Sequence, residues 1–139
     1  MAEPQASVTG SERPLSPHIW IYRWPLTMVT SITHRITGVA TVAGLVLVTL
    51  FLVATALGRD AFNFAHAALA AWYGRLILFG FTLTLCYHLL NGIRHLVWDT
   101  GAGFGLKTSR NSGIAVIVGT FILTLIIWLA AYWFAGALR

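Results

Sequence analysis

The stretch GVATVAGLVLVTLFLVATAL, residues 38–57, decides the fold, because it runs for 20 residues without a charged side chain. A helix rises 1.5 Å per residue, so this segment would be about 30 Å long, the thickness of a bilayer's hydrocarbon core. The helix is expected to begin earlier, near Pro25, since proline is tolerated in a first helical turn. Gly58, Arg59 and Asp60 mark its expected end.

Two further apolar segments follow. LILFGFTLTLCYHLLNGI, residues 76–93, is uncharged over 18 residues, and residues 113–138 are uncharged over 26. Trp72 and Tyr73 precede the first of these and Trp98 follows it, as expected for aromatic side chains at the two membrane surfaces. The sequence therefore predicts an all-α integral membrane protein. Its N-terminal arm would cover residues 1–25, and its three-helix domain, residues 26–139, would have transmembrane helices at about 26–57, 67–98 and 112–138.

Composition supports a membrane protein. Apolar residues make up 58% of the 139-residue chain and charged residues only 9%, whereas soluble domains carry about 25% charged residues. The net charge is +5, but the nine basic residues stand singly between apolar segments and form no patch. A nucleic-acid partner is therefore not expected. The single cysteine, Cys86, cannot by itself form a disulfide framework, a zinc site or an iron–sulfur site.

The distribution of basic residues predicts the orientation in the membrane. If the N-terminus is inside, six basic residues lie on the cytoplasmic side and three on the outer side, in line with the positive-inside rule. The first 25 residues hold all four prolines and no continuous apolar run, so they do not look like a signal peptide. We therefore expect a cytoplasmic arm and a bacterial inner membrane, or a mitochondrial inner membrane if the protein is organellar.

Polar residues gather near the cytoplasmic end of the first predicted helix. In SITHRITG, the side chains of Ser31, His34, Arg35 and Gly38 fall on one helical stripe about 100° wide. Ionisable groups inside a membrane helix are costly, so they are functional candidates by default. The alternative for Arg35 is an interfacial arginine that extends to lipid headgroups.

The second predicted helix carries a matching cluster in YHLLNGIRHLVWDTG. His88, Gly92, His95 and Asp99 share a stripe about 60° wide. His88 is the deepest ionisable group of this helix, about 9 Å further into the membrane than Arg94 by the helical rise. A buried imidazole at that depth needs a partner, which could be a backbone carbonyl, a polar group of another subunit, or a metal ion.

Haem iron is one such metal, because neutral imidazole ligates it and a b-type haem needs no covalent attachment motif. His88 and His95 are about 10 Å apart along the axis, too far apart to share one iron. With untilted helices, His34 would lie level with His95, and Thr41 would be the residue level with His88. His66 lies near the opposite surface, so a second ligand is expected from another polypeptide.

The two clusters also carry a family pattern. RPLSPHIWIYRWPLTMVTSITHRITG and HLLNGIRHLVWDTG resemble the two signatures of the cytochrome b556 membrane-anchor subunits of succinate dehydrogenase, respiratory complex II. Together they cover about 40 of the 139 residues, at the right separation. The resemblance implies three transmembrane helices that pack with a companion small anchor subunit. It also implies an iron–sulfur subunit and a flavoprotein subunit, and electron transfer from the iron–sulfur subunit to ubiquinone.

The resemblance assigns roles to several residues. His88 would be an axial ligand of haem b, and a histidine of the companion anchor would be the other. Ser31 and Arg35 would line the quinone site, and His34, Arg35 and His95 would lie near the haem propionates. Two further positions are carried over, Asp99 near the same cytoplasmic-side site and Arg94, although an ideal helix turns Arg94 about 120° away from His88.

Two other interpretations remain open from the sequence. One is a cytochrome b anchor of another dehydrogenase. The other is a haem-free structural anchor or transporter subunit, which would show no Soret absorbance. The choice between ubiquinone and menaquinone, the haem potential, the higher oligomeric state and the preferred reaction direction are not encoded in a readable pattern.

Overall fold

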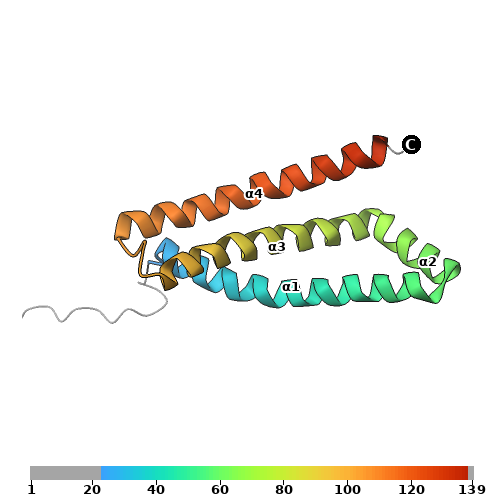
Figure 1. Cartoon of the computed structure of the whole chain (residues 1–139), viewed down its shortest axis with the longest axis horizontal. Coiled ribbons are helices and arrows are strands. Elements are labelled where there is room, and N and C mark those ends of the chain that lie inside the picture. The colour runs from blue at the N-terminus through green and yellow to red at the C-terminus, as the bar shows by residue number, and fades with distance from the viewer. Residues whose placement is uncertain (1–22, 138–139) are drawn as a thin grey trace, which may run out of the picture.

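The structure is a computed structural model that describes residues 23–137. These residues form four helices, α1 (Leu26–Leu57), α2 (Arg59–Ala70), α3 (Trp72–Asp99) and α4 (Leu106–Ala137). Figure 1 shows α1 and α3 running side by side in opposite directions, with the short α2 joining them at one end. Helix α4 meets the pair at the α3–α4 connection and diverges from α3 toward the C-terminus (Figure 1). All but the last three residues of the expected N-terminal arm lie outside the described residues.

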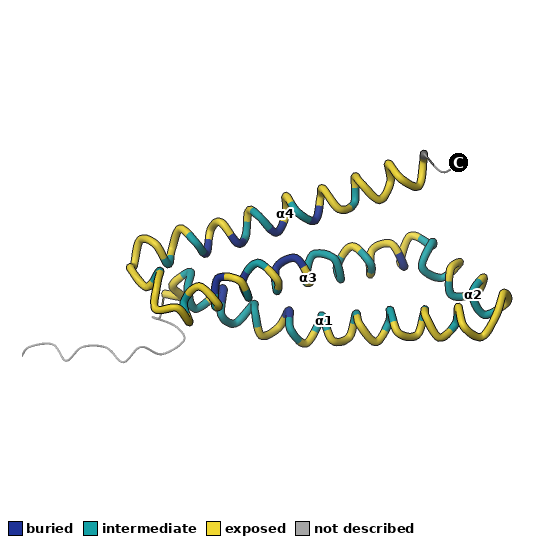
Figure 2. The backbone as a smooth tube through the Cα atoms, in the orientation of Figure 1, coloured by how far each residue is buried: buried dark blue, intermediate teal, exposed yellow. Residues whose placement is uncertain are grey.

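Helices α1, α3 and most of α4 are each long and apolar enough to cross a membrane. Large apolar side chains are exposed along all three, including Val39 on α1 at 75% and Trp133 on α4 at 77%. Figure 2 shows that exposed residues predominate along α1 and α4. Such surfaces are favourable only against lipid or another subunit. The predicted all-α architecture with three transmembrane helices is therefore confirmed.

The interior of the described structure is polar rather than apolar. Its buried side chains include Cys86, Tyr87 and Val116 among the apolar types, and a larger polar set of Thr30, Thr37, Asn91, Arg94, Thr120 and Thr124. Most of these threonines satisfy their hydroxyl within their own helix, as Thr37 does by donating to the Thr33 carbonyl at 2.8 Å. A bilayer supplies no water, so polar groups gather where protein can bond them.

Helix α2 was not expected as a separate element. The sequence predicts a second helix from about residue 67, whereas the structure ends α2 at Ala70 and begins α3 at Trp72. Ala71 lies between them with extended dihedral angles, φ −63° and ψ 159°. The break itself contains no glycine or proline, and alanine favours helix on both sides of it. The nearest sequence feature is Gly74, where a Cβ would overlap the backbone of Ala68 and Leu69 in α2. Helix α4 likewise begins at Leu106, before the expected residue 112.

Close packing of α1 against α3 depends on Gly44. A Cβ atom built on Gly44 would overlap the aromatic ring of Phe81, with three ring atoms inside normal contact distance. The ring therefore occupies the space that any other residue at position 44 would need. Gly80, one position before Phe81 on α3, has nothing within 4 Å of a built Cβ.

We expect Gly44→Ala to destabilise the protein by about 1–3 kcal/mol, because Phe81 or the whole of α3 must shift to admit the methyl group. Gly80→Ala is the matched control and should be neutral or slightly stabilising, since alanine favours helix and meets open space there. Thermal unfolding of the purified membrane complex measures both. Equal melting temperatures for the two variants would contradict this packing.

Candidate functional site: a histidine cluster on the α1–α3 pair

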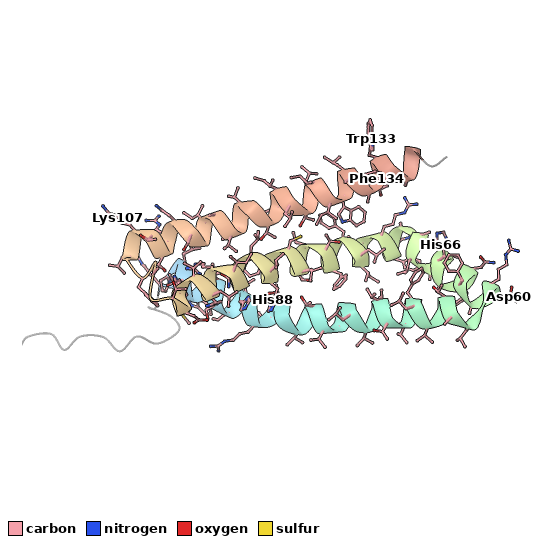
Figure 3. All side chains as sticks on the ribbon, in the orientation of Figure 1. Asp60, His66, His88, Lys107, Trp133 and Phe134 are labelled. Carbon is pink, nitrogen blue, oxygen red and sulfur yellow. The ribbon has the colours of Figure 1, made fainter. Side chains whose placement is uncertain are left out.

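Three histidines from two helices meet near the end of the bundle that carries the α3–α4 connection. The ring of His34 on α1 stacks on that of His88 on α3, with centroids 4.1 Å apart and planes 7° from parallel. The ring of His95, two turns further along α3, has its centroid 5.0 Å from that of His34. All three are half-buried in the isolated chain. Figure 3 shows His88 between α1 and α3, far from His66 at the α2 end.

One nitrogen of His88 is already occupied. Its Nδ1 lies 3.2 Å from the backbone carbonyl oxygen of His34. A carbonyl only accepts, so Nδ1 carries the proton and the lone pair of the neutral ring is on Nε2. This is the arrangement of a typical metal-ligating histidine, whose second nitrogen is oriented by a protein acceptor. Within residues 23–137 no group of three or more His, Cys, Asp or Glu side chains could hold a metal ion.

The expected level of His34 was wrong. The sequence placed His34 level with His95 and Thr41 level with His88, but the structure stacks His34 directly on His88. Gly38 is also beside His88, since a Cβ at position 38 would lie 3.1 Å from His88 Cε1. The limits of apolar segments define depth only to about one turn, roughly 5.4 Å, and they carry no information on helix register.

The stacked pair could not itself sandwich a macrocycle. Axial ligands approach an iron from opposite faces, whereas the His34 and His88 rings lie face to face with only 4.1 Å between their centroids. The Nδ1 atom of His34 is buried and has no hydrogen-bond partner. Position 92 is also open, since a built Cβ would only touch His34 Cε1 at 4.0 Å. The cluster therefore has one unsatisfied polar atom, His34 Nδ1, and open space beside Gly92.

The cluster faces away from α4. Arg94 binds α4 through Ser109 and Ser112, and it is about 120° around α3 from His88. The histidines thus lie on the side of the α1–α3 pair that α4 leaves uncovered.

The remaining predicted site residues are Ser31, Arg35 and Asp99. Ser31 and Arg35 are one helical turn apart on α1, on the same stripe as His34, with Ser31 half-buried and Arg35 exposed. Asp99 is exposed at the last residue of α3. The roles assigned to these residues stay predictions.

Arg94 has a different environment from its neighbours. It is 6% exposed, and its Nε donates to Ser112 Oγ at 2.9 Å while Nη2 donates to the Ser109 carbonyl at 2.9 Å. Its Nη1 donates to Thr30 and Asn91, so the side chain joins α1, α3 and α4. A role of Arg94 at the cofactor site stays a prediction, and in this structure all three of its nitrogens are bonded to the protein.

Sequence reasoning missed most of this buried network. Asn91 is fully buried at 0% exposure and Thr30 at 1%, and the hydroxyl of Tyr87 donates to the Thr30 carbonyl at 3.0 Å. An asparagine within a membrane helix, three residues before an arginine, was a usable signal because the two side chains share a helical face. The serines of α4 carried no such signal, since their role depends on how α4 packs.

Residues 9–127 match the family described as succinate dehydrogenase/fumarate reductase transmembrane subunit. The chain belongs to this family. It is 45% identical over 121 residues to the succinate dehydrogenase cytochrome b556 subunit of Paracoccus denitrificans, which covers 87% of this chain and 93% of that protein. The b556 subunit of Rickettsia prowazekii is 35% identical over 85% and 92% of the two chains. The mitochondrial b560 subunit of Sus scrofa is 43% identical over 81% and 68%.

Membership in the transmembrane-subunit family confirms the resemblance seen in the two sequence signatures. The chain is a cytochrome b membrane-anchor subunit of succinate dehydrogenase, complex II. It is a multi-pass protein of a bacterial or mitochondrial inner membrane. Its part in the enzyme is that of a subunit of an oxidoreductase complex.

Proposed function

We propose that this anchor subunit binds haem b through Nε2 of His88 and forms one wall of a quinone site with Ser31 and Arg35. The observation that carries the proposal is the contact between His88 Nδ1 and the His34 carbonyl, 3.2 Å. It orients the imidazole and leaves the lone pair of the neutral ring on Nε2, the nitrogen that would ligate iron. The names of the b556 and b560 relatives support a b-type haem.

The residues around His88 fit such a group. Nitrogen donors are common axial ligands of haem iron. Gly38 lets the His88 ring approach α1 closely, and Gly92, where a built Cβ would meet only His34 Cε1 at 4.0 Å, leaves space beside the cluster. The buried and unpartnered Nδ1 of His34 is available to a propionate, and His95 lies 5.0 Å from His34 on the same side. Arg35 offers a charge-assisted donor near the membrane surface.

The second axial ligand would come from the companion small anchor subunit. His34 is excluded as that ligand by its stacking on His88, and His66 lies at the far end of the bundle (Figure 3). The face that carries His88 is uncovered by α4, which supports docking of the companion there. When bound, haem b supplies a one-electron redox centre between the two subunits.

Ser31 and Arg35 would act on the quinone. The Ser31 hydroxyl can donate to a quinone carbonyl oxygen, and Arg35 can stabilise negative charge on that oxygen as electrons arrive from the iron–sulfur subunit. Such stabilisation is strong where water is excluded. Two electrons and two protons convert the quinone to the quinol, and Asp99, exposed at the last residue of α3, would pass a proton from the surface. The substrate is proposed to be ubiquinone, and the N-terminus and this site are proposed to face the cytoplasm or mitochondrial matrix.

A reduced-minus-oxidised spectrum of the purified complex, together with its subunit masses, tests the proposal. We expect one low-spin b-type haem per complex, and four polypeptides that include the flavoprotein, the iron–sulfur subunit and the companion anchor. A complex without Soret absorbance would contradict the haem assignment. A low-spin haem in the isolated chain, without the companion, would contradict the shared ligation.

A further inference from the structure

Arg94 is a buried cation, and its hydrogen-bond partners in the part of the chain that the structure describes are all neutral. Besides Ser112 and Ser109, its Nη1 donates to Thr30 Oγ1 at 3.2 Å and to Asn91 Oδ1 at 3.3 Å. Buried charges are usually paired with an opposite charge, yet no carboxylate within residues 23–137 forms an ion pair with Arg94. Because Arg94 donates to every one of these acceptors, it also fixes the orientation of the side chains that accept from it.

The contact with Asn91 determines which way the Asn91 amide points. Arginine can only donate, so the atom of Asn91 that faces Nη1 must be the oxygen. The amide nitrogen is thereby turned toward His95 Nε2 and the Thr30 carbonyl, each 3.5 Å away. An amide NH₂ also can only donate, so His95 Nε2 must accept. His95 is then neutral, and its remaining proton is on Nδ1.

A second side chain connects Arg94 to the same histidine. The guanidinium carbon lies 4.0 Å from the centre of the Trp98 ring, and the His95 ring meets Trp98 edge-on with centroids 5.3 Å apart. Arg94 thus supports residues one turn before and one turn after itself. Both of these residues contact His95, which in turn lies 5.0 Å from His34.

We infer that Arg94 and Asn91 are positioning residues that hold His95 as the neutral Nδ1–H tautomer and present this donor to the bound haem or quinone. The inference rests on the proposed function, since His95 matters only if a ligand occupies that face. Arg94 would therefore act from the α4 side of the helix on a site it does not touch. The competing role is purely structural, in which Arg94 only joins α1, α3 and α4.

Asn91→Leu separates the two roles. Leucine has a similar volume, removes the amide and carries no charge, while Arg94 keeps its bonds to Thr30, Ser109 and Ser112. The Thr30 carbonyl keeps the Tyr87 hydroxyl at 3.0 Å as a donor, so it does not lose its only partner in this variant. Arg94→Gln is the second variant. Arg110→Gln is the matched control, because Arg110 is an exposed arginine on α4.

The experiment compares the purified complexes by electron paramagnetic resonance of the haem, by KM and kcat for ubiquinone, and by melting temperature. For Asn91→Leu we expect a shifted haem resonance and a three- to tenfold higher KM, about the effect of one lost hydrogen bond, with a smaller change in kcat. Arg94→Gln should shift the resonance and KM likewise and also lower the melting temperature. Arg110→Gln should match the wild type in all three.

A wild-type resonance and KM in Asn91→Leu would overturn the inference and leave Arg94 as a helix clamp, even if Arg94→Gln fails to assemble. A wild-type complex that contains no haem would instead overturn the proposed function, and with it this inference. The haem content of the wild-type complex, measured before any variant is made, distinguishes failure of the proposed function from failure of this inference.

Discussion

His88→Ala is expected to abolish the low-spin haem spectrum of the purified complex. The substitution removes Nε2, the proposed ligating nitrogen, which carries the lone pair because Nδ1 is bonded to the His34 carbonyl. His34 cannot substitute from its stacked position 4.1 Å away without a rearrangement of α1. The expected result is complete loss of haem, or a high-spin haem held by the companion's ligand alone.

The measurement is the reduced-minus-oxidised spectrum per mole of complex, with succinate oxidation by a dye as the test of assembly. His66→Ala is the control, since His66 lies on α2 at the opposite end of the bundle and stacks on Phe62 (Figure 3). It should leave the spectrum unchanged. An unaltered low-spin spectrum in an intact His88→Ala complex would show that iron is held elsewhere.

The second large effect is expected from Arg35→Ala. We expect quinone reduction to fall about 100-fold, the usual cost of removing one charge-stabilising donor from a site that excludes water. Dye-linked succinate oxidation should survive, because that reaction does not use the quinone site. Ser31→Ala should lower quinone reduction by a smaller factor, about tenfold, the worth of one hydrogen bond to a charged group.

Arg59→Ala serves as the control for Arg35→Ala. Arg59 is an exposed arginine too, but it begins α2 at the other membrane surface. Arg35→Lys should recover part of the activity, since it restores the charge but not the planar fork of the guanidinium. If Ser31→Ala and Arg35→Ala both keep full quinone reductase activity, the quinone site lies elsewhere, and Arg35 is an interfacial residue in contact with lipid headgroups.

Much of the fold was readable because membrane helices obey strong constraints. A run of 18 or more uncharged residues has few structural alternatives in a bilayer, since every backbone polar group must be satisfied within the segment. Helix α2 was missed because it does not obey these constraints. An alanine-rich helix of 12 residues is fixed neither by length nor by hydropathy, and it ends at Ala70, where its backbone lies against Gly74 of α3.

Part of the site was readable as well. Histidines and glycines at spacings of three and four share a helical face whatever the helix packs against, so the stripe that holds His88, Gly92 and His95 could be found without coordinates. The sequence did not decide whether the partner of His88 is a backbone carbonyl, a polar group of another subunit or a metal ion. A contact between residues 34 and 88 depends on the register of two helices, and side-chain periodicity within one helix contains no information on that register.

The amino-acid sequence alone therefore determined the number of membrane crossings and the polar stripe of each helix, because both follow from hydrophobic length and from the 3.6-residue period. Only the tertiary structure decided that His34 stacks on His88, that its carbonyl orients the ligating ring, and that Arg94 bonds across three helices. These contacts arise when separate helices meet. Their geometry is a property of the packing between helices, which local sequence does not encode.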